Sequence, residues 1–168
     1  MMTTPLHNAK LYHIRDLFLF SCYTGIPYGD MCMLTKEDLA TDEDGTLWIK
    51  TSRKKTKIDY EVPLLDILIY IIGKYRDVDS DGKLLPMYSN SEMNRHLKDI
   101  GKGLGLHQPL TMYCARHSWA SIARDEGIPL SVISEGMRHD SEKTTQIYLA
   151  SLKTEVIDKA NRKILELL

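Results

Sequence analysis

A change of hydrophobic period early in the chain constrains the fold more than any other feature. Apolar residues first recur at spacings of three and four: Leu11, Ile14, Phe18 and Cys22. This pattern predicts a helix that stops near Gly25. Residues 46–53 and 58–63 then read as two strands around a basic turn, and a weaker strand is expected at 37–40. Such short strands predict a small antiparallel sheet.

Beyond residue 63 the period is helical again. Together with a short helix after Gly25, the expected helices cover 28–34, 64–76, 91–103, 113–126, 129–137, 141–150 and 155–168. The segment 64–76 is apolar enough to be largely buried, and the polar segment 77–90 is expected to be a loop. The predicted class is therefore α+β, mostly α-helical, with one small antiparallel β-sheet near the N-terminal third.

Composition indicates an ordinary globular chain. The 168 residues are 43% hydrophobic and 27% charged, which is enough for one domain with its own core. The longest apolar run, 67–72, is far too short to cross a bilayer, so no membrane partner is expected. An odd number of cysteines, without paired spacing or a signal peptide, predicts a reducing cytoplasm: Cys22, Cys32 and Cys114.

Charge gives a divided indication about nucleic acid. The net charge of -1 argues mildly against such a partner. A tight basic cluster nevertheless occupies the predicted hairpin tip: Arg53, Lys54, Lys55 and Lys57. Hairpin tips are often lysine-rich for solubility alone, but a local cluster can also grip phosphate on a neutral protein. Taken alone, the cluster favours the solubility interpretation over a DNA-binding one.

Two motifs imitate ligand sites. Residues 77–82 resemble the start of a calcium-binding loop, but Tyr88 stands where a bidentate glutamate is needed, which favours a solvated acidic turn. The glycines of 101–105 lack the frame of a phosphate loop, which favours a helix end. The histidines show no metal-binding spacing. No metal or cofactor is therefore expected.

Three further motifs follow the basic turn in a fixed order. Arg116 and His117 form a basic pair on a predicted helix, a glycine-containing segment ends at His139, and Tyr148 follows nine residues later. Each has a structural alternative, since a helix-surface pair and a half-buried core tyrosine are both common. The ordered set resembles the tyrosine recombinase, or phage integrase, family, whose motifs run Arg, Lys, His-x-x-Arg, Leu-Gly-His, Tyr.

The resemblance covers residues 11–150. Segments 20–25 and 115–120 look especially like integrases of Bacteroidetes mobile elements. It implies the tyrosine recombinase catalytic-domain fold, with residues 1–168 as a single catalytic domain. The N-terminal core-binding domain that the family usually carries is expected to be absent from this chain.

The resemblance also implies roles for individual residues. Tyr148 matches the nucleophile, and Arg116 matches the second arginine of the family. The hairpin lysine, the histidine beside the second arginine, the third-box histidine and the acidic residue after the first box match Lys55, His117, His139 and Asp30. Arg53, Lys54 and Lys57 are the expected DNA-binding residues.

Three positions depart from the family pattern. Pro27 stands where the first-box arginine is expected, Tyr113 replaces the first histidine of His-x-x-Arg, and Arg138 occupies the third-box glycine position. Proline carries no charge and no N–H, so it cannot replace the arginine. Arg138 is the first candidate substitute, and Arg15 and Arg53 are weaker ones. Tyr113 can still donate a hydrogen bond to phosphate.

The family cleaves DNA without metal or nucleotide, through a 3′-phosphotyrosine intermediate. A free tyrosine, with a pKa of about 10, is almost un-ionised at neutral pH and needs a proton acceptor or nearby positive charge. Arginine can pair with the non-bridging phosphate oxygens, and a lysine can protonate the leaving 5′ oxygen. In this scheme Arg116 and His139 share the phosphate, and Lys55 lies at the leaving oxygen.

The resemblance therefore implies site-specific DNA recombination or integration for a mobile genetic element. The expected partners are double-stranded DNA and a homo-tetramer on paired DNA sites, with a monomer for the isolated domain. Two alternatives remain open: a catalytically impaired DNA-binding remnant of the same fold, and an unrelated helical DNA-binding regulator. A covalent adduct between Tyr148 and DNA separates the first interpretation from both.

Overall fold

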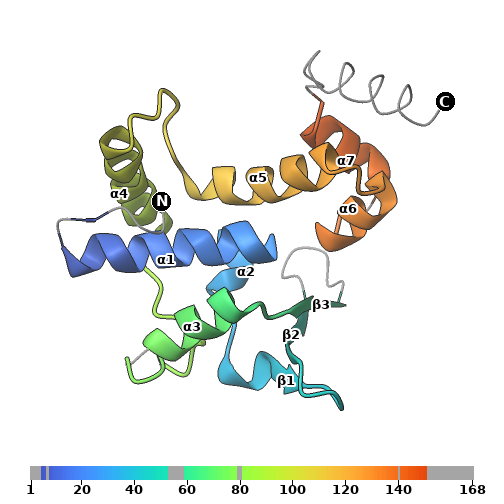
Figure 1. Cartoon of the computed structure of the whole chain (residues 1–168), viewed down its shortest axis with the longest axis horizontal. Coiled ribbons are helices and arrows are strands. Elements are labelled where there is room, and N and C mark those ends of the chain that lie inside the picture. The colour runs from blue at the N-terminus through green and yellow to red at the C-terminus, as the bar shows by residue number, and fades with distance from the viewer. Residues whose placement is uncertain (1–4, 7, 53–58, 79–80, 140, 151–168) are drawn as a thin grey trace. The chain divides into compact units, whose positions relative to one another are not determined.

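The computed structural model describes residues 5–6, 8–52, 59–78, 81–139 and 141–150. Its elements run in the order α1 (Ala9–Thr24), α2 (Tyr28–Met31), η1 (Lys36–Asp38), β1 (Leu39–Thr41), β2 (Leu47–Ser52), β3 (Asp59–Pro63), α3 (Asp66–Lys74), α4 (Asn90–Gly103), α5 (Met112–Asp125), α6 (Leu130–Gly136) and α7 (Glu142–Tyr148) (Figure 1). The predicted class, mostly helical with one small sheet, is confirmed. The helix expected at 155–168 lies outside the described residues.

The chain divides into two compact units, Met1–Trp119 and Ala120–Leu168. The division falls within α5. The first unit therefore holds the sheet, α1 to α4 and the first half of α5, whereas the second holds the end of α5 with α6 and α7.

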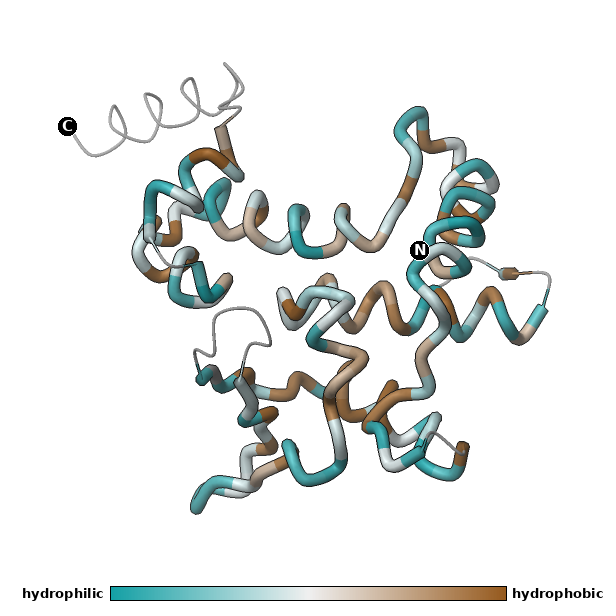
Figure 2. Tube along the Cα trace, turned by 180° about the vertical axis from the view of Figure 1, so that it is seen from behind, coloured by the Kyte–Doolittle hydropathy of each residue, from teal (hydrophilic) through white to brown (hydrophobic). Residues whose placement is uncertain are grey.

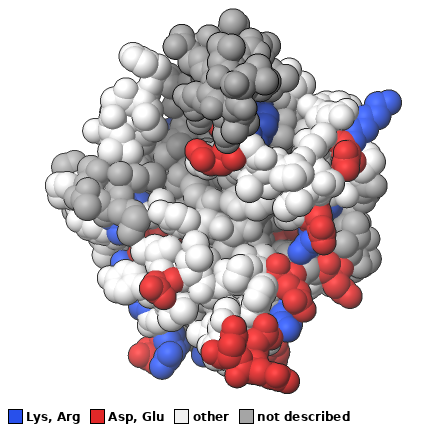
Figure 3. Space-filling model, turned by 45° about the vertical axis from the view of Figure 1, so that its right-hand side comes forward, with Lys and Arg blue, Asp and Glu red and all other residues white. Residues whose placement is uncertain are grey.

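The sheet is antiparallel, in the order β1-β2-β3. Ile49 at its centre is fully buried and pairs with Leu39 on one side and Val62 on the other. A tight turn at 42–45 joins β1 to β2, with Gly45 at φ 86°. Acidic side chains gather at the end of the molecule where the sheet lies (Figure 3).

Helix α1 forms the centre of the first unit. It packs against α3 and α4, and its buried residues lie on several sides rather than along one stripe: Ile14, Asp16, Leu17, Phe18, Leu19, Phe20, Ser21 and Thr24. Hydrophobic residues gather in the interior of this unit (Figure 2). A helix surrounded in this way positions every element that packs on it, including the loop that follows Thr24.

The expectation that 64–76 is largely buried was wrong. Leu68 and Ile71 of α3 are buried, but three apolar side chains on its other side are 39–65% exposed: Leu65, Ile69 and Tyr70. The reason is geometric, since successive residues of a helix point in all directions and this short helix is covered on one side. An apolar run alone does not reveal how many neighbours a helix has.

A buried carboxylate joins α1 to α3. Asp16 is 3% exposed and accepts hydrogen bonds from Lys74 Nζ (2.6 Å), the Tyr75 hydroxyl (2.8 Å) and Arg15 Nη2 (2.8 Å). Burial by itself would raise the pKa of Asp16, but the bonds from Lys74, Arg15 and Tyr75 outweigh it, and the pKa lies below its usual value. The His13 ring stacks on Tyr75 at 4.2 Å, and burial lowers the pKa of His13.

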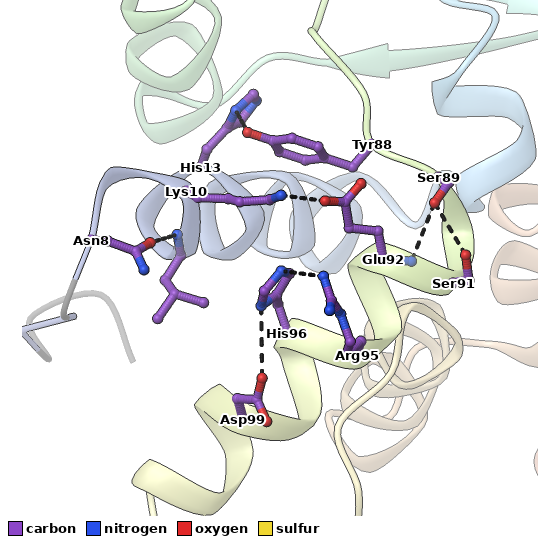
Figure 4. Close-up of polar contacts among 11 residues, drawn as sticks. Asn8, Lys10, His13, Tyr88, Ser89, Ser91, Glu92, Arg95, His96 and Asp99 are labelled. Atoms are coloured by element: carbon purple, nitrogen blue, oxygen red, sulfur yellow. Dashed lines mark hydrogen bonds and ion pairs between the residues drawn. The ribbon is translucent and has the colours of Figure 1, made fainter.

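Polar contacts also join α1 to the segment that contains α4 (Figure 4). Lys10 forms an ion pair with Glu92, and the Tyr88 hydroxyl lies 3.2 Å from His13 Nδ1. Both α1 and α4 have a side-chain cap at their start. Asn8 accepts from the Leu11 N–H in α1, and Ser89 accepts from the Glu92 N–H in α4. Tyr88 thus contributes to the packing of α1 against this segment.

Replacing Asp16 with asparagine is expected to lower the free energy of unfolding by about 3 kcal/mol, because two cations lose their shared buried partner. Since the folded carboxyl has the lower pKa, its stabilising contribution is complete above about pH 4 and disappears as the pH falls through the folded pKa. Urea denaturation between pH 3 and 7 measures both effects. Asp77→Asn, at an exposed site, is the control; equal stability of the Asp16 variant and its parent at pH 7 would contradict the assignment.

Candidate functional site

The first-box loop begins with a glycine that its geometry requires. Gly25 ends α1 with φ 69°, and its N–H donates to the Ser21 carbonyl at 2.9 Å. A Cβ at this position would lie 3.1 Å from the Trp119 ring. Both the left-handed backbone and the close ring favour glycine. Pro27 is the N-cap residue of α2 and has an extended backbone, with φ -72°.

Arg116 is bound to this same loop. It lies on α5, is 8% exposed, and its Nη1 donates to the Gly25 carbonyl at 2.5 Å. The structure therefore brings Arg116, which the resemblance matches to the second arginine, to the loop that contains Pro27. Burial of a guanidinium is costly unless its donors are used, and the carbonyl at the end of α1 is a favourable acceptor.

Helix α5 gathers three of the predicted site residues. Tyr113, Arg116 and His117 stand at spacings of three and four, which places them on one side of the helix. The rings of Tyr113 and His117 are 5.9 Å apart, and Tyr113 is 64% exposed. Asp30, the acidic residue after the first box, is 8% exposed in α2. These four residues all belong to the first unit.

Arg15 binds the buried carboxylate of Asp16. Its guanidinium donates twice to Asp16 and lies 4.9 Å from the centre of the Tyr12 ring. The side chain is 12% exposed. This arrangement argues against Arg15 as the substitute for the missing first-box arginine, because releasing it would leave the buried Asp16 carboxylate with fewer partners.

In the second unit, Arg138 occupies the left-handed position that ends α6. The Arg138 N–H donates to the Glu135 carbonyl at 2.9 Å, and the His139 N–H donates to the Ser134 carbonyl at 3.1 Å. These two bonds define a Schellman motif, in which the left-handed residue is usually glycine. Arg138 has φ 52°, and its Nη1 donates to the Glu135 carbonyl at 2.7 Å.

The structure brings His139 and Tyr148 together. Their ring centres are 5.7 Å apart with an edge-on angle of 64°. His139 Nδ1 lies 2.8 Å from the hydroxyl of Thr145, which is fully buried on α7. Arg124 Nη1 donates to the Leu149 carbonyl at 3.0 Å, which holds the end of the helix that carries Tyr148. The third-box histidine and the proposed nucleophile therefore share one polar cluster.

Other predicted site residues have different outcomes. The basic cluster lies outside the described residues: Arg53, Lys54, Lys55 and Lys57. Convergence of Arg116 with His139 and Tyr148 stays a prediction, because these residues belong to different units. Sequence reasoning missed Thr145 and Arg124. Spacing offered a weak indication for Thr145, since residues three apart share a helix face.

The described part of the chain has no candidate metal site. Within it, no group of three or more His, Cys, Asp or Glu residues could hold a metal ion. Within the same residues, none of the helices has the length and apolar character to traverse a bilayer. Gly101 and Gly103 lie at the end of α4, and Gly105 follows with φ 71°, which confirms a helix end at the glycine-rich segment.

Comparison with solved structures identifies the fold. The crystal structure of XerA recombinase aligns with a TM-score of 0.69 at 22% identity, covering 95% of this chain and 65% of that one. The XerH site-specific recombinase, in a post-cleavage complex with palindromic difH substrate, aligns with a TM-score of 0.76 at 17% identity, covering 95% and 48%. The chain thus has the fold of tyrosine recombinase catalytic domains.

Sequence comparison identifies the family. The model of the phage integrase family matches residues 1–155, and the chain belongs to that family. It is 32% identical over 161 residues to tyrosine recombinase XerA of Pyrococcus furiosus, covering 88% of this chain and 55% of that protein. A tyrosine recombinase of Thermosipho africanus is 24% identical over 147 residues, covering 83% and 50%. The chain therefore spans about half the length of these relatives.

Replacing Gly25 with alanine tests the geometry of the first-box loop. Alanine in a left-handed backbone costs about 1–2 kcal/mol, and here the Trp119 ring must also move. Gly45→Ala is a matched control, since Gly45 is also left-handed but has open space around it. Thermal or urea unfolding should show a larger loss for the Gly25 variant; equal losses would refute the contact with Trp119.

Replacing Arg138 with glycine is expected to stabilise the protein. Relief of the left-handed backbone is worth about 1–2 kcal/mol, and the greater freedom of glycine in the unfolded chain offsets part of it. Arg138→Ala loses the same bond to the Glu135 carbonyl without relieving the backbone, so it should be the less stable variant. If urea denaturation ranks alanine above glycine, the left-handed conformation at this position is wrong.

Proposed function

We propose that this chain is the catalytic part of a tyrosine recombinase that cuts and rejoins DNA through Tyr148. The observation that carries the proposal is the edge-on packing of His139 against Tyr148, with Thr145 bonded to the histidine. Membership of the phage integrase family and relatives named tyrosine recombinases support it. A mobile element of the Bacteroidetes type is the proposed genetic context, because segments 20–25 and 115–120 resemble integrases of such elements.

The proposed chemistry needs the residues that the two units carry. The Tyr148 oxygen forms a bond to the scissile phosphorus as its proton passes to an acceptor, and the bond from phosphorus to the 5′ oxygen breaks. Lys55 supplies a proton to that leaving oxygen, while Arg116 and His139 donate to the non-bridging oxygens. A guanidinium has five N–H donors, so the bond from Arg116 to Gly25 is compatible with donation to phosphate.

Double-stranded DNA is the proposed partner. The structural relative XerH is described in complex with its difH substrate, and this chain has the same fold. The proposed backbone contacts are the hairpin cations Arg53, Lys54 and Lys57. We further propose that four copies assemble on paired DNA sites and that the isolated domain is a monomer.

A second candidate function is favoured by one observation, the presence of Pro27 at the first-box position. A transition-state arginine in phosphoryl transfer can contribute about 10³–10⁵ in rate, so a chain without a substitute would bind DNA and cleave it very slowly.

For the recombinase, Arg138 is the proposed substitute for the missing arginine, because it directly precedes His139 and belongs to the same unit. Its long side chain can leave the Glu135 carbonyl to meet a phosphate.

A library of nicked duplexes with random core sequence tests the proposal. The nick lets the short 5′-hydroxyl strand diffuse away after cleavage, which traps the covalent complex. The expected result is a protein–DNA adduct at Tyr148, located by peptide mass spectrometry and lost in Tyr148→Phe. Tyr70→Phe is the matched control, since Tyr70 is 65% exposed on α3. If Arg138 is the substitute, Arg138→Ala should reduce adduct formation by about 10² while DNA retention is unchanged.

The outcomes separate the candidate functions. Adduct formation by the parent supports the recombinase. DNA retention on a filter without any adduct supports the impaired DNA-binding protein. Absence of both would overturn the two proposals.

A further inference from the structure

The hydroxyl of Thr145 contacts the imidazole of His139 within the second unit. Thr145 is fully buried, and its Oγ1 lies 2.8 Å from His139 Nδ1. Threonines in helices often donate instead to the carbonyl four residues earlier, as Thr24 does to Phe20 in α1 at 2.7 Å. Across the part of the chain that the structure describes, the Thr145 hydroxyl has the imidazole as its hydrogen-bond partner.

The surroundings of Thr145 favour one direction for this bond. A buried hydroxyl proton needs an acceptor, and Nδ1 of a neutral imidazole can accept. If the imidazole carried its proton on Nδ1, that proton would point at Oγ1 and the hydroxyl proton would have to find another acceptor. On this reasoning the threonine donates to Nδ1, and the ring proton of a neutral His139 is carried by Nε2.

Thr145 also connects His139 to the helix of the nucleophile. Thr145 and Tyr148 are three residues apart on α7, so they lie on the same face of that helix. His139 touches both, through the 2.8 Å contact and the edge-on ring packing at 5.7 Å. The Arg124 contact to the Leu149 carbonyl holds the end of the same helix. The orientation of the imidazole thus depends on α7 being packed in this position.

We propose that Thr145 is a positioning residue, which fixes His139 as the Nε2–H tautomer and couples its orientation to the helix that carries Tyr148. The inference rests on the proposed cleavage of DNA. Its consequence is that His139 presents an N–H donor to phosphate when α7 is in place. Assembly of the donor and of the nucleophile then becomes one event rather than two.

Three substitutions in the full 168-residue chain test the inference. Thr145→Val keeps the shape but removes the hydroxyl, Thr145→Ser restores it, and Thr144→Val makes the same change at the exposed neighbour on α7. The ¹⁵N chemical shifts of His139 report which ring nitrogen carries the proton. The parent, Thr145→Ser and Thr144→Val should show the Nε2–H form, and Thr145→Val should show a mixture of tautomers. Unchanged backbone spectra in all variants show that each is folded.

Cleavage of the nicked duplexes is the second measurement. Thr145→Val should slow adduct formation by about tenfold or more, whereas Thr145→Ser and Thr144→Val should stay near the parent rate. A parent that carries the proton on Nδ1, or a valine variant with the parent's spectrum and rate, would overturn the inference. So would a serine variant as slow as the valine variant, which would mean that packing alone matters.

Failure of the proposed function gives a different result. If the parent forms no adduct but the His139 spectra change as expected, recombination is rejected and the tautomer assignment stands. If the parent forms the adduct and the spectra do not respond to Thr145→Val, recombination stands and the positioning role is rejected.

Discussion

In the first unit, the hydrogen bonds to the buried carboxylate of Asp16, in the middle of α1, join α1 to α3. Burying an ion is unfavourable unless its partners are in place, so the bonds from Arg15, Lys74 and Tyr75 couple the position of α1 to that of α3. The chain leaves α1 at Gly25 through a left-handed turn, and Arg116 binds the Gly25 carbonyl at that turn.

Each unit has a left-handed helix end beside its candidate residues. Gly25 ends α1 two residues before Pro27, and Arg138 ends α6 just before His139. Glycine meets this requirement without strain, whereas arginine adopts the same conformation at a cost. The substitution at Arg138 therefore changes more than charge. It places a long cation at a turn whose backbone bonds to Glu135 and Ser134 set the start of the segment leading to α7.

Much of the fold could be predicted from local pattern. The period change located the sheet, and helix ends at Gly25 and after Gly103 followed from residue type. Burial of 64–76 could not be predicted, because an apolar run does not record which sides of a helix meet a neighbour. The buried position of Asp16 was equally unpredictable, since its partners Lys74 and Tyr75 are nearly sixty residues away in the chain.

The sequence by itself determined the order of the elements and the identity of the candidate residues, because hydrophobic period, turn chemistry and ordered motifs are local properties of a chain. Only the tertiary structure decided which polar groups meet. The bond between Thr145 and His139, the contact of Arg116 with the end of α1, and the bonds from Lys74 and Tyr75 to Asp16 all join groups through space. Their strength comes from burial, and burial is settled by packing.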